Sequence, residues 1–207
     1  MPATAAAPRD GNGGVRVVTM RASCVPRSGL PRSRLGDVAH LYLSHGASGS
    51  AAGLAPQIAG LRRRGVEATA VQLPKGRAER AMSVYLDVAA PSADTAIGGH
   101  SFGGRVASLI AAEHEYGALV LLSYPLHPPG GAERWDERTA HWPQIGCPVL
   151  LLSGDRDPFA RIGLLRDAVR RLPSTELIVY PGLGHGIGPV FEEALDEVAA
   201  FLKSTLA

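Results

Sequence analysis

The sequence predicts an α/β protein with a mostly parallel central sheet and helices on both faces. Short apolar runs of strand length alternate along the chain with segments whose apolar residues recur at helical spacing. Several of these runs are nearly continuous, as in GALVLLS at 117–123, which is typical of strands covered on both faces. Alternation of this kind favours parallel strands joined by helical crossovers.

The expected elements follow from these patterns in chain order. Seven strands are expected, the first of them at an edge, over residues 15–24, 38–43, 66–73, 95–98, 117–123, 147–153 and 177–180. Helices are expected over about 51–64, 79–88 and 105–115, then after Pro158, and finally with Phe191 to Leu202 on the buried face. Residues 26–36 and 124–146 hold several prolines and glycines and are expected to be loops.

Length and composition indicate one domain of ordinary globular character. The chain has 207 residues, 45% hydrophobic and 19% charged. We expect residues 1–14, rich in Ala, Pro and Gly, to be a disordered tail, and residues 15–207 to form a single domain. The formal net charge of +2 comes with no long basic block, so a nucleic-acid partner is not expected.

Cysteine usage and apolar runs bear on location. The spacing of Cys24 and Cys147 fits neither a metal site nor a disulfide framework, which favours a reducing, cytoplasmic setting. The first residues lack the apolar core of a secretory signal. No apolar run approaches the ~18 residues of a membrane span, so a membrane partner is not expected either.

The stretch Gly99-His100-Ser101-Phe102-Gly103 fits the G-x-S-x-G nucleophile elbow. A serine can be raised above the end of a parallel sheet on a sharp strand-to-helix turn, and such a turn leaves no room for side chains two residues to either side. An apolar strand precedes the motif and an amphipathic helix follows it. The context that the motif requires is therefore present.

Two further polar residues follow later strands, giving the chain order Ser101, Asp157, His185. Because the carboxyl ends of parallel strands meet at one edge, we expect the three to converge. His185 would accept the proton of Ser101, and Asp157 would hold the imidazole in the required tautomer. Asp155 lies on the same loop as Asp157 and is the alternative acid, or else a helix cap.

The loop at 44–50 ends a central strand, in a position from which it could supply one amide of an oxyanion hole. We expect the backbone N–H groups of Ala47 and Phe102 to form this hole. His45 is interpreted as a residue that fixes the loop. No residue set has the spacing of a metal site, and no cofactor is expected.

Candidate substrate contacts are less specific. His127 and Trp142 lie in the segment 124–146 and could bind substrate, although surface positions or loop packing are the alternatives. A cluster of cations follows the third strand and could receive an anionic substrate or simply be solvated, namely Lys75, Arg77 and Arg80.

The motifs together resemble the dienelactone-hydrolase-like α/β-hydrolases, in a branch with a short, capless core. The matching elements are His45-Gly46-Ala47, Gly99 to Ser108, Tyr124 to Gly130, Ser153 to Phe159 and Gly184-His185. The resemblance covers residues 38–205 and implies an α/β-hydrolase fold, trimmed at its N-terminal edge and with a minimal lid. It also implies a triad of Ser101, Asp157 and His185. Relatives in this branch include a subunit of a chromatin-modifying complex, so a non-catalytic scaffold that binds a protein is one alternative.

A second resemblance is to the stand-alone thioesterases of polyketide and peptide assembly lines, through residues 71–80 and the elbow. Those enzymes usually carry a helical lid where this chain has the short segment 124–146. We therefore expect a cofactor-free serine hydrolase that cleaves a small ester or thioester through an acyl-enzyme. Its partner would be a small-molecule acyl substrate, and the assembly-line thioesterase and the scaffold remain as alternatives.

Overall fold

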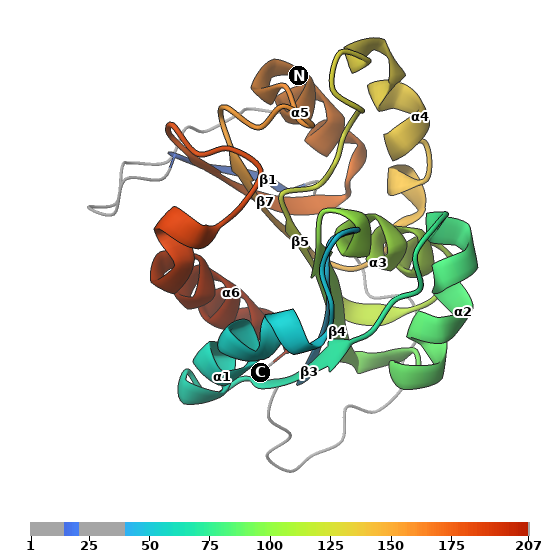
Figure 1. Cartoon of the computed structure of the whole chain (residues 1–207), viewed down its shortest axis with the longest axis vertical. Coiled ribbons are helices and arrows are strands. Elements are labelled where there is room, and N and C mark those ends of the chain that lie inside the picture. The colour runs from blue at the N-terminus through green and yellow to red at the C-terminus, as the bar shows by residue number, and fades with distance from the viewer. Residues whose placement is uncertain (1–14, 21–39, 207) are drawn as a thin grey trace.

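A computed structural model of the chain describes residues 15–20 and 40–206 (Figure 1). Its strands form one seven-stranded sheet in the order β1-β7-β6-β5-β4-β2-β3. The strands are β1 (Val15–Met20), β2 (His40–Ser44), β3 (Glu67–Val71), β4 (Ser92–His100), β5 (Tyr116–Leu122), β6 (Val149–Gly154) and β7 (Ser174–Tyr180). Neighbours run parallel except β1, which pairs antiparallel with β7 at the edge. This confirms the mostly parallel sheet.

Helices cover both faces of the sheet, as predicted (Figure 1). The α-helices are α1 (Ala55–Arg63), α2 (Ala78–Val88), α3 (Phe102–Glu113), α4 (Trp135–Thr139), α5 (Ile162–Ala168) and α6 (Phe191–Leu206). Short 3-10 turns add η1 (Ala52–Leu54), η2 (Ala132–Arg134), η3 (Trp142–Gln144), η4 (Val169–Arg171) and η5 (Gly188–Val190). The helices α1 and α6 pack on one face, while α2, α3 and α5 pack on the other.

Alternate residues of the central strands contribute to two apolar clusters, one on each face of the sheet. In β5, Leu119 and Leu121 join the cluster under α2 and α3, whereas Val120 and Leu122 join the cluster under α1 and α6. Each of these side chains is at most 3% exposed. A strand buried on both faces has no polar face, which explains the unbroken apolar runs of the sequence.

The observed elements differ from the predicted ones mainly at their ends. β7 begins at Ser174 rather than at 177, because its polar first residues pair with β1, Thr175 standing opposite Thr19. α3 begins at Phe102, immediately after Ser101. Apolar periodicity does not reach these positions, where backbone pairing and the elbow turn decide the structure. The expected tail at 1–14 and loop at 26–36 lie outside the described residues.

The segment 124–146 holds only short helical pieces, and α4 has five residues. Its aromatic residues pack down onto the domain: Trp142 is fully buried with its ring edge-on to Tyr124, their centroids 5.1 Å apart. The guanidinium of Arg171 lies 4.4 Å from the ring centre of Trp135. The segment is thus anchored on the fold and forms a minimal lid. In the described part of the chain, no helix is both long and apolar enough to span a membrane.

Candidate active site

The elbow is a one-residue turn from strand to helix. β4 ends at His100 and α3 begins at Phe102, so Ser101 alone makes the turn. Its backbone has φ +50° and ψ −113°, a conformation that L residues rarely adopt. The Ser101 N–H donates to the carbonyl of Leu122 at 2.8 Å, and this bond to the end of β5 helps to hold the strained turn.

Close backbone contacts explain both motif glycines. A Cβ on Gly99 would lie 2.4 Å from the carbonyl carbon of Gly103, and a Cβ on Gly103 would lie 2.4 Å from Oγ of Ser44. Both distances are far below any van der Waals contact. The strand and helix of the elbow therefore pass against each other, and against the end of β2, so closely that only glycine fits.

Three side chains meet at the carboxyl edge of the sheet. His185 Nε2 lies 2.8 Å from Ser101 Oγ. On the other side of the ring, His185 Nδ1 lies 2.8 Å from Oδ2 and 3.0 Å from Oδ1 of Asp157. These distances form an unbroken hydrogen-bonded chain from carboxylate to imidazole to hydroxyl. The structure thus brings together the three residues that the sequence placed after different strands.

The carboxylate of Asp157 is fully shielded from solvent, with a side-chain exposure of 0%. Its Oδ1 also accepts a hydrogen bond from the backbone N–H of Phe159 at 2.8 Å. The Phe159 ring packs against the His185 ring, with centroids 4.3 Å apart. A buried acid with several N–H donors is held in one orientation, and the imidazole between Asp157 and Phe159 has little freedom to turn.

Asp155 is exposed and faces a different partner. Its Oδ1 accepts a hydrogen bond of 2.7 Å from the N–H of Gly182, on the loop that carries His185. The alternative that Asp155 caps the next helix is wrong, since α5 begins after Arg161 and has no side-chain cap. Asp155 instead ties the loop after β6 to the loop after β7.

The two amides expected to form an oxyanion hole belong to the start of α3 and to the turn after β2. The Phe102 N–H is in the first turn of α3, where backbone donors have no intrahelical acceptor. Ala47 is exposed in the turn after β2, and within the described residues its N–H donates to no backbone carbonyl. A Cβ on neighbouring Gly46 would lie 3.7 Å from Cβ of Ser101, so this turn packs against the elbow.

Comparison with known proteins agrees with this architecture. Residues 68–194 match the family described as an alpha/beta hydrolase domain. The chain belongs to this family. No curated protein sequence matches this hydrolase-family chain.

Solved structures of similar fold are numerous. One is a monoacylglycerol lipase of Paleococcus ferrophilus, with TM-score 0.67 and 17% identity over 80% of this chain and 94% of the other. Est1E from Butyrivibrio proteoclasticus has a TM-score of 0.65 and 16% sequence identity, and the match covers 98% of both chains. The Pyrococcus furiosus esterase Pf2001 has a TM-score of 0.64 and 19% sequence identity, and the match covers 83% of both chains. At these identities the likeness establishes the shared α/β-hydrolase fold.

Two further histidines position the loops of the site. His45 is buried, and its Nε2 accepts the N–H of Leu73 at 3.0 Å while Nδ1 lies 2.7 Å from the carbonyl of Gly46. This confirms that His45 fixes the loop after β2. His100 Nε2 lies 3.1 Å from the carbonyl of His185, and burial lowers the pKa of His100. A neutral His100 therefore donates to the backbone of the loop that carries His185.

The two residues expected to bind substrate, His127 and Trp142, are both buried. His127 is 2% exposed and both ring nitrogens are engaged: Nε2 accepts the N–H of Arg161 at 3.0 Å, and Nδ1 lies 2.9 Å from the carbonyl of Pro128. Trp142 is 0% exposed and packs in the core. The structure does not place either side chain where a substrate could touch it. His127 instead braces the loop beyond Asp157, since its own N–H donates to the carbonyl of Phe159.

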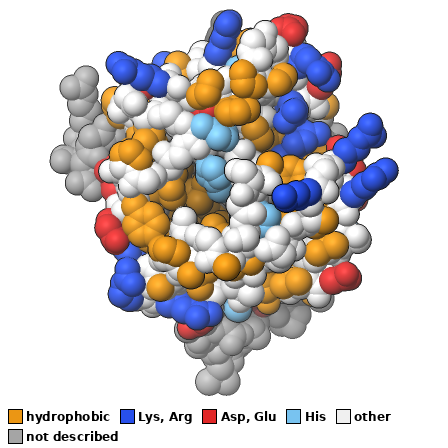
Figure 2. Space-filling view, viewed as in Figure 1, with side chains coloured by type: hydrophobic (Ala, Val, Ile, Leu, Met, Phe, Trp, Pro, Cys, Tyr) orange, Lys and Arg blue, Asp and Glu red, His pale blue; other side chains and the backbone are white. Residues whose placement is uncertain are grey.

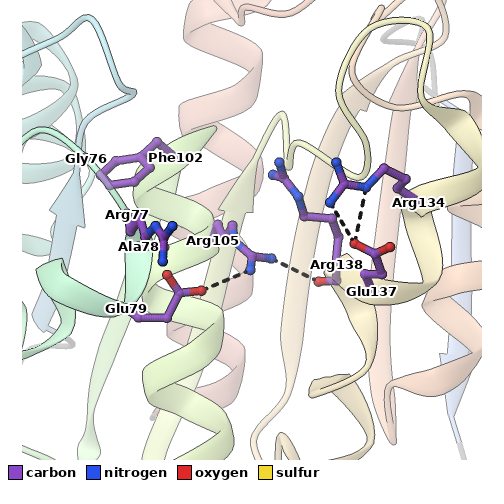
Figure 3. Close-up of a pocket in the computed structure, with 9 residues that line it drawn as sticks. All are labelled: Gly76, Arg77, Ala78, Glu79, Phe102, Arg105, Arg134, Glu137 and Arg138. Atoms are coloured by element: carbon purple, nitrogen blue, oxygen red, sulfur yellow. Dashed lines mark hydrogen bonds and ion pairs between the residues drawn. The ribbon is translucent and has the colours of Figure 1, made fainter.

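A pocket of about 470 Å³ borders the elbow, and of its lining the sequence predicts only Arg77 as a substrate contact (Figure 3). Phe102, which directly follows Ser101, forms part of its wall. Of the three cations noted after the third strand, Arg77 lines this pocket, while Lys75 and Arg80 do not. Among the described residues, no group of three or more His, Cys, Asp and Glu side chains could hold a metal ion.

Proposed function

We propose that this chain is a serine hydrolase that cleaves a small ester or thioester through an acyl-enzyme. The observation that carries the proposal is the hydrogen-bonded chain from Asp157 through His185 to Ser101, at the point where α3 begins. A strained serine held against an imidazole, which is itself held by a buried carboxylate, is the arrangement that nucleophilic acyl transfer requires.

In the first half of the reaction, Ser101 Oγ attacks the carbonyl carbon and its proton passes to His185 Nε2. The carbonyl π electrons move to oxygen, and the amides of Phe102 and Ala47 stabilise the resulting negative charge. One such donor typically lowers the barrier by ~3 kcal/mol. The tetrahedral species then collapses: the C–O or C–S bond breaks, and the leaving group takes the proton from the His185 imidazolium.

In the second half, water replaces the departed alcohol or thiol. His185 takes a proton from the water as its oxygen attacks the acyl carbon, and the proton passes to Ser101 Oγ as the acyl–Ser101 bond breaks. The products are a carboxylic acid and the free enzyme. Asp157 stays ionised throughout and stabilises the imidazolium in both halves.

The openness of the site supports a small or exposed acyl substrate. Ser101 is partly exposed, and the side chain of His185 is 22% exposed. Figure 2 shows histidine side chains beside a hollow on this face of the molecule. The short segment 124–146 also supports the esterase over the assembly-line thioesterase, whose lid is helical. The solved structures named above include a monoacylglycerol lipase and an esterase, so ester cleavage is the chemistry that these two names share.

Turnover of simple esters tests the proposal. We expect the wild type to hydrolyse 4-nitrophenyl acetate and S-acetyl thioesters, and Ser101→Ala to lose at least about a thousandfold in kcat, since the residual rate would rest on the oxyanion hole alone. Thermal unfolding of both proteins controls for folding. Equal rates in the two proteins would contradict the proposal, and a folded wild type with no turnover of any ester would favour the scaffold.

A further inference from the structure

The pocket beside the elbow is built by three segments of the chain. Phe102 and Arg105 come from α3, residues 76–79 come from the turn before α2 and its first two residues, and Arg134, Glu137 and Arg138 come from η2 and α4. Figure 2 shows Lys and Arg side chains gathered over these elements. Because Phe102 directly follows the nucleophile, the pocket adjoins the elbow, and a molecule whose reactive bond lies at Ser101 can extend into it.

The pocket carries an excess of positive charge. Four arginines line it (Arg77, Arg105, Arg134 and Arg138) and two carboxylates oppose them (Glu79 and Glu137), which leaves a formal charge of +2. Apolar walls are limited to Phe102 and Ala78. A neutral hydrophobic acyl chain would find little apolar surface here and would desolvate cations without compensating them.

Ion pairs account for only half of these cations. Arg105 lies 3.4 Å from Glu79, and Arg134 lies 3.0 Å from Glu137. Within residues 15–20 and 40–206, no carboxylate stands at ion-pair distance from Arg77 or Arg138. In Figure 3 these two guanidinium groups approach the space between α2 and α4 from opposite sides. Both retain N–H donors for a ligand.

Arg138 is the more informative of the two. It is only partly exposed, and its Nη1 makes one long contact, 3.4 Å from the carbonyl of Pro125. Burial and the neighbouring Arg105 both lower the pKa of Arg138. A partly desolvated cation beside another cation is destabilised until an anion binds. Guanidinium groups also bind carboxylate and phosphate oxygens in a bidentate, directional way.

We propose that this pocket binds an anionic group of the substrate, a carboxylate or a phosphate, while the scissile carbonyl lies at Ser101. The inference rests on the proposed serine hydrolase and narrows its substrates to acyl compounds that carry a negative charge beyond the reacting bond. Arg77 and Arg138 would contact the anion. Arg105 would add to the local positive potential while remaining paired with Glu79.

Matched esters test this directly. The probes are 4-nitrophenyl hydrogen adipate and its methyl ester, which differ in the terminal charge and by one methyl group, together with a 4-nitrophenyl ester that ends in a phosphonate. We expect the wild type to prefer at least one charged ester over the methyl ester by about tenfold in kcat/KM, because an anion bound by guanidinium groups gains charge-assisted hydrogen bonds. This preference should shrink as sodium chloride is raised. The better charged probe distinguishes carboxylate from phosphate.

Two variants locate the effect. In Arg138→Gln and Arg77→Gln, the ratio of kcat/KM for the charged ester over the methyl ester should fall toward one. Arg166→Gln serves as the matched control, since Arg166 is exposed on α5 and lies outside the pocket. A wild type without any preference for charge, or a preference that survives both pocket variants, would overturn the proposal.

Failure of the pocket and failure of the hydrolase are distinguishable. If no ester is turned over at all, the proposed function fails, and binding of adipate and of inorganic phosphate to Ser101→Ala still tests the pocket by calorimetric titration. Saturable binding that Arg138→Gln abolishes supports the anion site. Absence of binding of both anions overturns it.

Discussion

At the scale of single residues, the contacts of His185 assign its tautomer. Its Nδ1 faces both carboxylate oxygens of Asp157, which can only accept hydrogen bonds when ionised. The ring proton therefore lies on Nδ1, and Nε2 presents its lone pair to the Ser101 hydroxyl at 2.8 Å. Exchange of the carboxylate for an amide would remove this constraint, since an amide nitrogen can itself donate.

Asp157→Asn should therefore lower kcat/KM by about 10³–10⁴, the loss seen when a triad carboxylate becomes an amide and the imidazole takes the wrong tautomer. Asp155→Asn is the matched control. Its amide oxygen can still accept the Gly182 N–H, so its activity should stay within a few-fold of wild type. The measurement is ester hydrolysis by the three proteins, with thermal unfolding alongside. A larger loss in Asp155→Asn would contradict the assignment of the acid.

Sequence spacing could not decide between these two acids. Both lie on the loop after β6, and the deciding contact is between two loops. A Cβ on Gly154 would lie 2.0 Å from the carbonyl oxygen of Leu183, so the loops after β6 and β7 cross almost in contact. That crossing turns Asp157 toward His185 and Asp155 toward Gly182, and it has no signature along the chain.

At the scale of elements, a half-buried histidine connects α3 to the segment 124–146. His141 Nε2 lies 2.9 Å from Oγ of Ser108 on α3. Burial, assisted by the positive charge of Arg105, lowers the pKa of His141 to about 4 from an ordinary 6.5. Because the unfolded chain binds a proton on this side chain between pH 6.5 and 4 while the folded chain does not, acid favours unfolding over that window.

The contribution of His141 to the free energy of unfolding should therefore be largest above pH 6.5. As the pH falls to 4, this contribution should decrease by an amount on the order of 2 kcal/mol. In His141→Gln, which retains a polar group toward Ser108, the acid-induced loss should be smaller by that amount. Denaturant unfolding at several pH values measures it. His114→Gln, on an exposed histidine, is the control, and identical pH profiles for wild type and His141→Gln would refute the prediction.

The apolar pattern of α2 predicts the helix but not the hydrogen bonds that its side chains make. The apolar face of α2 predicts a helix at almost its observed position. The pattern does not show that the hydroxyl of Tyr85, fully buried, accepts the N–H of Gly98 at 3.0 Å and lies 2.7 Å from the carbonyl of Tyr42. One side chain of α2 thus connects β2 with β4 just below the elbow.

At the scale of the whole molecule, the fold class was predictable because both faces of the sheet are covered. Covered strands must be apolar throughout, and the covering helices must be amphipathic, so each leaves a clear pattern. The order of strands leaves none: β2 lies between β3 and β4 through pairing of backbone groups. The polar start of β7 was missed for the same reason, since its partner is the backbone of β1.

The triad could be predicted from the sequence, whereas the pocket beside the elbow could not. Ser101, Asp157 and His185 each follow a strand, so the topology of a parallel sheet is enough to predict that they meet. The pocket takes Arg77 from the residue before α2, Arg105 from α3, Arg134 from η2 and Arg138 from α4. These segments meet through helix packing, which depends on side-chain shape in three dimensions.

The measurement that tests the central claim most directly is covalent labelling by a fluorophosphonate probe, read as intact mass. A fluorophosphonate reacts with a serine hydroxyl that an adjacent base has activated. We predict a single adduct on the wild type and none on folded Ser101→Ala. An unlabelled, well-folded wild type, or equal labelling of both proteins, would contradict the assignment of Ser101 as an activated nucleophile.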